Sequence, residues 1–252
     1  MERIRIMPCL DMQDGRVVKG VRFVDVRDAG DPVACCRAYC AQGADEIAML
    51  DITATTENRG TLLSVVRAVA AEVTIPFTVG GGIRDVASAE AVLNAGAHKV
   101  STNSAAFRKP DVIGEMVDAF GPERVTVAID VIQNPAFPSG YEVCIDGGTT
   151  ATGVDAIEWA KRVDGFGVRV ILPTSKSTDG MRTGFDLPLI RKLKQAVNAE
   201  IVASGGAGTM QHFLEAAQAG ATILLGASVF HFNIIRIPEL KEFLKQKGIM
   251  SF

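Results

Sequence analysis

The sequence predicts one α/β domain in which eight parallel strands alternate with helices and close into a barrel. Three observations support this prediction: a length of 252 residues, a regular alternation of short β-branched runs with amphipathic stretches, and an internal repeat. Parallel strands joined by crossover helices produce such an alternation. A chain of roughly 250 residues is also the usual length of one α/β barrel.

Eight runs rich in β-branched residues are the predicted strands. They lie near residues 4–10, 46–52, 76–80, 98–102, 124–130, 168–174, 200–204 and 222–226. The predicted helices follow them, near residues 32–42, 58–72, 85–95, 109–119, 153–163, 186–197, 209–219 and 237–247. Eight strand–helix units are typical of a TIM barrel. The alternative, an open doubly wound sheet, would have fewer strands and usually a G-x-G-x-x-G motif after the first, which is missing here.

An internal repeat indicates that the barrel consists of two duplicated halves. Residues 79–104 align without gaps on residues 203–228. The alignment places Gly81 and Gly82 on Gly205 and Gly206, and Ser104 on Ser228. The period is too long for a solenoid. We therefore predict a single domain, 1–252, built from half-barrels that cover approximately 1–122 and 123–252.

The composition argues against several classes of function. The formal net charge is -3, from 26 Lys+Arg and 29 Asp+Glu, and no segment collects the basic residues that nucleic-acid binding requires. No apolar run approaches the roughly 18 residues of a membrane span. The amino terminus also lacks the apolar core of a secretory signal. We therefore expect a cytoplasmic protein that binds neither nucleic acid nor membrane.

The five cysteines indicate no disulfide framework, no metal site and no catalytic nucleophile. Their number is odd and their spacing forms no framework. Cys36 and Cys40 lie one helical turn apart, but together with Cys35 they do not complete four metal ligands, and no His is near. A catalytic Cys usually lies at a strand–helix elbow, whereas Cys9 and Cys144 lie inside predicted strands. If the chemistry uses ammonia, it must come from a separate subunit or from solution.

Two glycine runs at strand ends predict phosphate sites. The active site of this fold lies at the carboxyl ends of the strands, where Gly80-Gly81-Gly82 ends strand three and Gly205-Gly206 ends strand seven. Glycine lets backbone N–H groups turn toward an oxyanion. Each run has a partner after the next strand, Thr102-Asn103-Ser104 and Ala227-Ser228. One run alone would more simply be a tight turn, but the duplication favours a substrate phosphorylated at both ends.

Asp11 and Asp130 are the predicted acid–base pair. Each closes a predicted strand, and the period-two alternation turns both side chains into the barrel mouth from opposite sides. Two carboxyl groups that face one substrate can act as general acid and general base. A lone Asp at a strand end is more often a cap or turn residue, but two at equivalent positions favour catalysis.

Seven short motifs run in order from end to end of the chain: PCLDMQDGRVVKG, GDP, LDITA, PFTVGGGIRD, VAIDV, SGGAG and ASVFHF. Together they closely resemble the cyclase subunit of imidazole glycerol phosphate synthase, over essentially the whole chain. A sister isomerase of the same pathway shares the duplicated glycine runs. DGRVVKG and SVFHF are specific to the cyclase.

The resemblance implies a lyase of histidine biosynthesis without a cofactor. Ammonia would react with a bisphosphorylated ribulosyl-formimino carboxamide ribonucleotide to form imidazole glycerol phosphate and an aminoimidazole carboxamide ribonucleotide. Asp11 and Asp130 would be the catalytic acid and base. Lys19, in the loop after strand one, would help to bind and enclose the substrate, although by itself it is typical of a solvated loop charge. The residues implied in substrate and phosphate binding are Gly81, Gly82, Asn103, Ser104, Thr174, Asp179, Gly180, Gly205, Gly206, Ala227 and Ser228.

The resemblance also implies a glutaminase partner at the opposite, amino-terminal face of the barrel. Family members place a charged ring there, at the entrance of the ammonia path, and Arg5, Glu46 and Lys99 match three of its members. The fourth, an acid on strand six, falls on Val170. Two cations and one anion leave an unbalanced charge, which is costly unless water or another acid compensates, so we expect an altered or leaky entrance. The alternative is that these charges only solvate the barrel floor.

One serine and the three histidines of the chain give weaker indications of function. Ser177 replaces an Asp of the family in the loop after strand six, which would change substrate or rate rather than reaction class. His98 occupies a position that is usually acidic, near the expected partner. His212 and His231 have no triad neighbour and no metal spacing, and we expect both to be structural.

Two alternatives to the cyclase stay open. One is an isomerase on the same scaffold, which would convert the precursor aldose to the ketose without ammonia. The other is a phosphosugar-binding barrel that has lost catalysis, or a paralogue that aminates another sugar, as suggested by Val170 and Ser177. Activity without a nitrogen source would identify the isomerase, and tight binding without turnover would identify the binding protein.

Overall fold

The computed structural model describes residues 3–21, 24–54, 57 and 60–249. For residues 19–21 and 24–29 only the backbone is described, so the side chain of Lys19 lies outside the described part of the chain. Within the part that is described, no helix is long and apolar enough to cross a membrane.

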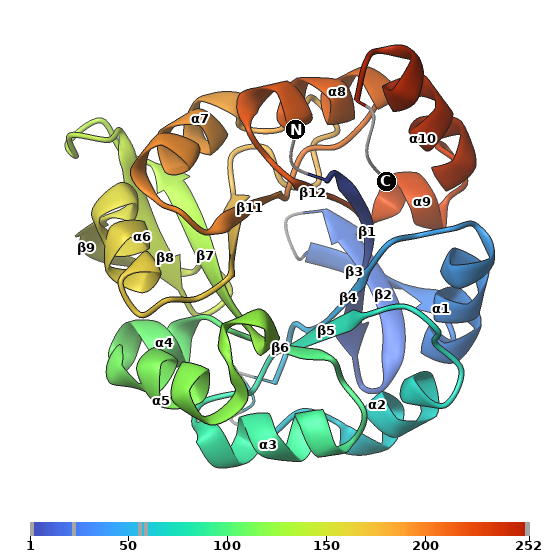
Figure 1. The fold of residues 1–252 in the computed structure, drawn as a ribbon, viewed down its shortest axis with the longest axis horizontal. Coiled ribbons are helices and arrows are strands. Elements are labelled where there is room, and N and C mark those ends of the chain that lie inside the picture. The colour runs from blue at the N-terminus through green and yellow to red at the C-terminus, as the bar shows by residue number, and fades with distance from the viewer. Residues whose placement is uncertain (1–2, 22–23, 55–56, 58–59, 250–252) are drawn as a thin grey trace.

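A closed parallel barrel forms the centre of the molecule (Figure 1). Its eight strands are β1 (Arg5–Gln13), β4 (Ile47–Asp51), β5 (Phe77–Gly80), β6 (Lys99–Thr102), β7 (Val125–Gln133), β10 (Val170–Ser175), β11 (Glu200–Ala203) and β12 (Ile223–Gly226). They pair in the order β10, β11, β12, β1, β4, β5, β6 and β7, and the pairing of β10 with β7 closes the ring. The predicted TIM barrel is confirmed, and each predicted strand overlaps one of these eight.

The longer helices surround the barrel as a continuous outer ring (Figure 1). They are α1 (Pro32–Ala41), α2 (Leu63–Ala70), α3 (Val86–Asn94), α5 (Asp111–Phe120), α6 (Ala156–Asp164), α7 (Leu187–Ala196), α8 (Met210–Ala219) and α10 (Ile237–Gln246). Several begin at a side-chain cap that the preceding loop supplies, such as Asp85 on α3 and Thr209 on α8. All eight predicted helices are confirmed, with shorter bounds.

The strands bury two separate sets of side chains because successive residues point to opposite faces. The larger set fills the space between sheet and helices. The smaller set lies inside the barrel: Met7, Cys9, Ala48, Val170, Leu172, Val202, Ile223 and Leu225. The middle of the barrel interior is therefore mostly apolar, although the same alternation turns the buried Thr78, Ser101 and Thr126 inward as well.

Two β-hairpins that the sequence did not predict extend the sheet beyond the barrel. One consists of β2 (Arg16–Val21) and β3 (Val24–Gly30) and follows β1; the other consists of β8 (Tyr141–Ile145) and β9 (Thr150–Asp155) and follows β7. β1 and β7 have 9 residues each, whereas the other barrel strands have 4 to 6. Lys19, expected in a loop, lies in β2. The matched hairpins agree with a duplication, but the division at residue 122 stays a prediction.

Three short elements were also missed: α4 (Ser104–Arg108), η1 (Pro122–Arg124) and α9 (Ser228–His231). α4 and α9 follow the strands β6 and β12, which occupy equivalent positions in the two halves of the chain. Turns of this length carry no helical periodicity that a sequence can reveal.

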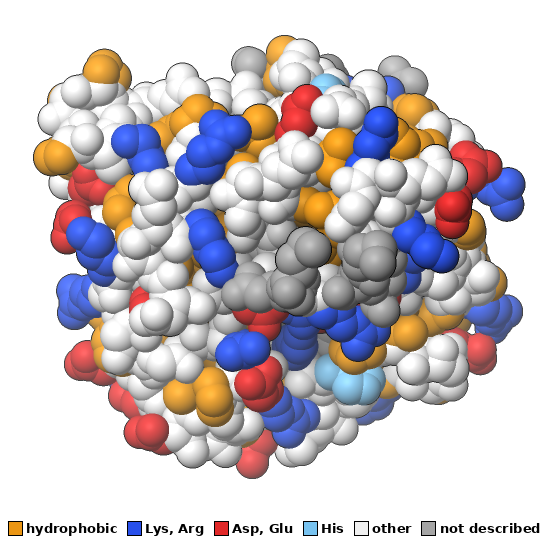
Figure 2. Space-filling model, turned by 45° about the horizontal axis from the view of Figure 1, so that its top comes forward, with side chains coloured by type: hydrophobic (Ala, Val, Ile, Leu, Met, Phe, Trp, Pro, Cys, Tyr) orange, Lys and Arg blue, Asp and Glu red, His pale blue; other side chains and the backbone are white. Residues whose placement is uncertain are grey.

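The molecular surface mixes charges of both signs. Figure 2 shows Lys and Arg side chains interspersed with Asp and Glu over one face, with apolar side chains in separate small groups. The large hydrophobic side chains that are exposed in the described part are Met181, Phe232 and Ile234.

A buried carboxylate connects the second hairpin to the barrel. Asp186 caps α7 by accepting a hydrogen bond from the Leu189 backbone N–H, and it also accepts from Tyr141 Oη at 2.7 Å and Ser175 Oγ at 2.8 Å. These donors come from β8 and β10. Burial, with the neighbouring Asp186 carboxylate, raises the pKa of Tyr141 above its usual range, so the hydroxyl stays a donor. Asp186 thus fixes the hairpin and the loop after β10 relative to each other.

We expect Asp186→Ala to lower the free energy of unfolding by about 3 kcal/mol, because it removes a helix cap, the acceptor of the buried Tyr141 hydroxyl and one of the hydrogen bonds of Ser175. Tyr141→Phe removes one of these bonds and should cost about 1 kcal/mol. Urea denaturation followed by circular dichroism measures both. The exposed Asp118 on α5 provides the control, since Asp118→Ala should stay within about 0.5 kcal/mol of wild type. A loss below about 1 kcal/mol for Asp186→Ala would contradict the role of Asp186.

Candidate active site

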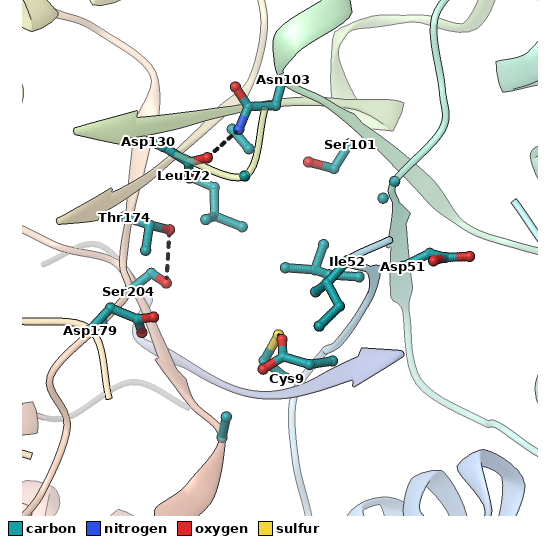
Figure 3. A pocket seen from close by; sticks show the side chains of 18 of the residues that line it. Cys9, Asp51, Ile52, Ser101, Asn103, Asp130, Leu172, Thr174, Asp179 and Ser204 are labelled. Atoms are coloured by element: carbon teal, nitrogen blue, oxygen red, sulfur yellow. Dashed lines mark hydrogen bonds between the residues drawn. The ribbon is translucent and has the colours of Figure 1, made fainter. Parts of the chain in front are cut away.

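A cavity of about 530 Å³ opens at the carboxyl ends of the barrel strands. Every strand of a parallel barrel ends at the same mouth, so residues far apart in the sequence meet there. Figure 3 shows Asp130 and Asn103 at the top of this cavity, Thr174, Ser204 and Asp179 on its left, Ile52 on its right and Cys9 at the bottom of the view. The cavity extends inward to Leu172 of the apolar interior.

Asp11 and Asp130 both line the cavity. β1 and β7 are four pairings apart in either direction around the ring of eight strands, so the two side chains enter from opposite sides. Each Asp lies where its strand begins to pair with the hairpin that follows: Asp11 pairs with Val18 and Asp130 with Cys144. The hairpins therefore hold the two carboxylates in place from outside the barrel.

The Asp130 carboxyl lies in an environment that disfavours its charge. Burial raises its pKa from 3.8 to about 6, and the hydrogen bond that Asn103 Nδ2 donates to Oδ2 at 3.1 Å opposes this rise. Lys176 also lowers the pKa, whereas Asp179 raises it. A carboxyl group with a pKa of about 6 can give or take a proton near neutral pH.

The first predicted phosphate site is a strained glycine turn after β5. Gly81 has a φ of +94°, and a Cβ atom there would collide with the carbonyl group of Asp51, so only glycine fits. The Gly81 carbonyl oxygen accepts a hydrogen bond from Thr61 Oγ1 at 2.5 Å. Gly81, Gly82, Asn103 and Ser104 line the same end of the cavity, as predicted.

The second glycine turn, after β11, also has positive φ angles, +81° at Gly205 and +110° at Gly206. Here the close contact falls at Gly206, where an added Cβ atom would collide with the carbonyl group of Gly184. The remaining residues that the sequence predicted for this part of the site also line the cavity: Thr174, Asp179, Gly180, Gly205, Gly206, Ala227 and Ser228. The structure therefore brings together every predicted mouth residue whose side chain it describes.

Sequence reasoning missed several cavity residues. Ser204 lines the mouth and accepts a hydrogen bond from Thr174 Oγ1 at 3.2 Å. Its place one residue before Gly205, at a strand end, could have indicated it. Two arginines were also missed. Arg108, on α4, donates from Nη2 to both carboxylate oxygens of Asp146, at 2.7 and 2.6 Å, and Arg182 donates to Ser228 Oγ at 3.3 Å.

Asp146 lies close to the first glycine turn. Its backbone N–H donates to Ser104 Oγ at 2.9 Å, and both Asp146 and Arg108 line the cavity. One arginine therefore lies beside each predicted phosphate site. No sequence signal distinguished these two from other surface arginines.

At the opposite end of the barrel, Arg5, Glu46 and Lys99 form the expected charged group. Arg5 Nη1 contacts Glu46 Oε1 at 2.6 Å, and Lys99 Nζ contacts Glu46 Oε2 at 2.7 Å. Val170 lies in the apolar interior, as its position predicted. The expected imbalance of charge is nevertheless wrong, because Arg5 also pairs with Glu200, a second anion that the sequence analysis did not include.

The other singled-out residues have structural contacts. Ser177 does not line the cavity; its hydroxyl bonds Ser175 Oγ at 2.9 Å. His98 packs edge-on against Phe77, and burial with Arg124 and Lys99 lowers its pKa. His231 lies between Tyr39 Oη, at 2.6 Å, and the Cys9 carbonyl oxygen, at 3.1 Å.

His212 completes the capping box of α8, so the structural role expected for this residue and for His231 is confirmed. The five cysteines are free thiols. Within the described ranges, no three His, Cys, Asp or Glu side chains are grouped to hold a metal ion.

The fold and the cavity define a class of protein: a single-domain TIM barrel whose polar mouth carries two carboxylates on opposite sides, with a glycine turn midway between them on each side of the ring. Comparison with known proteins narrows this class. The family model described as "Histidine biosynthesis protein" matches residues 5–236.

Three relatives share the name "Imidazole glycerol phosphate synthase subunit HisF". The protein of Nocardia farcinica (strain IFM 10152) is 49% identical over 251 residues, 98% of each chain. That of Thermobifida fusca (strain YX) is 48% identical over 248 residues, and that of Salinispora tropica (strain ATCC BAA-916) is 49% identical over 247 residues, in both cases 97% of each chain. The chain belongs to the family of imidazole glycerol phosphate synthase subunit HisF.

The contact between Asn103 and Asp130 predicts a measurable change of pKa. Asn103→Leu keeps the size of the side chain but removes the donor, so the pKa of Asp130 should rise further above 6. A carboxyl-carbon NMR titration, with the Asp130 signal assigned by its loss in Asp130→Asn, measures the shift. An unchanged titration midpoint would show that the hydrogen bond does not stabilise the ionised form.

The raised pKa also predicts that Asp130 lowers stability at neutral and higher pH. The folded state holds the proton of the Asp130 carboxyl more tightly than the unfolded state does. The protonated carboxyl therefore contributes its full stabilisation of the folded state below pH 3.8, and this contribution is lost as the pH rises through about 6. The difference between the two pKa values, 3.8 and about 6, corresponds to a free energy of about 3 kcal/mol. Asp130→Asn should therefore raise the free energy of unfolding by about 2 kcal/mol at pH 8 and by much less at pH 4. Equal effects at the two pH values would refute this account.

Proposed function

We propose that this protein is the cyclase of imidazole glycerol phosphate synthase, a lyase of histidine biosynthesis. It would use ammonia to convert the bisphosphorylated ribulosyl-formimino carboxamide ribonucleotide into imidazole glycerol phosphate and the aminoimidazole carboxamide ribonucleotide. The observation that carries the proposal is the arrangement of Asp11 and Asp130 on opposite sides of one cavity, between two equivalent glycine turns. The names of the relatives agree with it.

The two glycine turns would bind the two phosphate groups. Around the first, backbone N–H groups near Gly81 and Gly82 would act with Asn103 and Ser104, and the neighbouring Arg108 would add positive charge. The residues proposed around the second are Asp179, Gly180, Gly205, Gly206, Ala227 and Ser228, with Thr174 beside them. A substrate held at both ends would span the mouth and place its reacting carbons between the carboxylates. Lys19 is proposed to cover it.

Acid–base chemistry would be divided between the two carboxylates. Addition of ammonia to a carbonyl carbon, ring closure and departure of the carboxamide ribonucleotide each require a proton to be removed from nitrogen or delivered to a leaving group. Asp130, with a pKa of about 6, suits both directions of transfer. Asp11, across the cavity, would perform the complementary step on the other face of the substrate.

The partner that the family resemblance implies is a glutaminase, and we propose that it docks at the amino-terminal face. The relatives are named as subunits of a synthase. The charged group of Arg5, Glu46 and Lys99 lies at that face, and the apolar interior lies between it and the mouth. Neutral ammonia could cross such an interior, whereas an ion would lose its hydration. The site of synthesis is proposed to be the cytoplasm.

The direct test supplies the bisphosphorylated substrate with ammonium chloride at alkaline pH and follows product formation. Wild type should turn over, and Asp11→Asn and Asp130→Asn should each lower kcat/KM by at least about 100-fold, because each removes a general acid or base. The matched control is Asp14→Asn, an exposed carboxylate in the turn after β1 that does not line the cavity. It should behave as wild type.

Full turnover in both Asp variants would exclude the proposed roles of Asp11 and Asp130. Activity on the precursor aldose without any nitrogen source would instead identify the isomerase. Binding of the substrate without turnover under any nitrogen source would identify a non-catalytic barrel.

A further inference from the structure

The charges at the amino-terminal end of the barrel form a continuous chain of ion pairs. Lys99 contacts Glu46, Glu46 contacts Arg5, and Arg5 contacts Glu200. We call these four residues the floor ring. Its side chains are largely buried, with exposed fractions of 18% for Arg5 and Glu200, 14% for Lys99 and 3% for Glu46. Two cations and two anions balance each other.

The family resemblance expects an acid at Val170 on β10, and Glu200 lies on the neighbouring strand β11. Val170 on β10 pairs in register with Glu200 on β11, so the two residues lie at the same level of the barrel on neighbouring strands. Val170 points into the barrel interior, and so does Val202. Because Glu200 precedes Val202 by two residues on the same strand, its side chain points inward as well.

Arg5 explains why an acid is needed at this level. A largely buried guanidinium needs hydrogen-bond acceptors on more than one side, since it carries donors on both terminal nitrogens, and Lys99 already shares Glu46 with it. Glu46 satisfies one terminal nitrogen and Glu200 the other. With Val170 in place and no Glu200, that second nitrogen would face an apolar strand end.

Glu200 is itself held by groups at the edge of the barrel. Thr222 Oγ1 donates to its Oε2 at 3.1 Å, and Arg169 Nε donates to its Oε1 at 2.9 Å. Arg169 is 54% exposed and also lies 3.7 Å from Glu123. Glu200 therefore connects a cation at the surface to the cation inside the barrel.

We infer that Glu200 is the positioning residue that closes the floor ring in this protein, in place of an acid on β10, and so keeps the ammonia path sealed from solvent. The inference rests on the proposed function, because only an ammonia-using barrel needs such a path. Glu200 holds Arg5 over the apolar interior, and Arg169 links this contact to the face where the partner would dock. The acid has moved by one strand, and the charge of the ring is unchanged.

The test uses the full chain in complex with the glutaminase subunit of its own synthase, supplied with glutamine. Glutamate and imidazole glycerol phosphate are measured together. When all ammonia reaches the mouth, the two form in equal amounts; ammonia that escapes produces excess glutamate. Glu200→Gln should raise the ratio of glutamate to product by about fivefold or more, the lower end of the range for coupling between two sites.

A second variant tests whether the ring needs its second acid at residue 200 or can have it on the neighbouring strand. Val170→Glu combined with Glu200→Gln returns the acid to β10, next to the same guanidinium, and should restore the wild-type ratio. Glu123→Gln is the matched control, because Glu123 contacts Arg169 but is not part of the floor ring. It should keep equal amounts of the two products.

Each outcome decides the inference. An unchanged ratio in Glu200→Gln, or a double variant that folds but stays uncoupled, would overturn it. If Glu200→Gln does not fold, Glu200→Asp is measured instead. It keeps the charge on a shorter side chain and should still form more glutamate than product. Equal amounts of glutamate and product in Glu200→Asp, together with a double variant that stays uncoupled, would also overturn the inference. Failure of wild type to form product from ammonium chloride would refute the proposed function instead, independently of Glu200.

Discussion

The pairing of β10 with β7 closes the sheet, and the arrangement of every polar group on the barrel axis follows from this closure. In a closed parallel sheet, alternate side chains of all strands must share one narrow interior, and they stack in layers. Here the floor layer is charged, the middle layers are apolar, and the mouth is polar. The same alternation that buries Val170 and Val202 therefore also decides which carboxylates face each other.

The carboxylates of the floor and of the mouth are stabilised in different ways. Glu46 and Glu200 are in direct contact with cations, and these ion pairs hold the floor together. Asp130 receives a hydrogen bond from the neutral Asn103, and its burial outweighs that contact, so its pKa rises. Ion pairing favours a fixed position, whereas desolvation favours proton exchange. One barrel axis thus carries a structural pair of acids and a reactive one.

The sequence predicted the parts of the structure that depend on periodicity, and it missed those that depend on contact. Strands and helices of the barrel follow from apolar patterns of period two and 3.6. The hairpin β8–β9 has no such pattern, because its strand Thr150–Asp155 is mostly exposed and contains a glycine. The mouth residues followed from the rule that the strands end there. Arg108 and Arg182 did not, because only the folded chain brings Arg108 to Asp146, 38 residues away, and Arg182 to Ser228, 46 residues away.

Glu200 could be predicted in part: its direction follows from periodicity, but its partner depends on contacts in the folded chain. Its inward direction follows from its spacing to Val202, so the alternation predicts a charge on the barrel floor. Its partner does not follow, because Arg5 is 195 residues away and only the closed ring of strands brings the two together. A residue-by-residue comparison with the family therefore reports a lost acid at Val170, whereas the folded barrel contains the same number of opposing charges. In a ring of strands, the demand for a counter-charge belongs to a level of the barrel rather than to one strand, so an acid on a neighbouring strand can meet it.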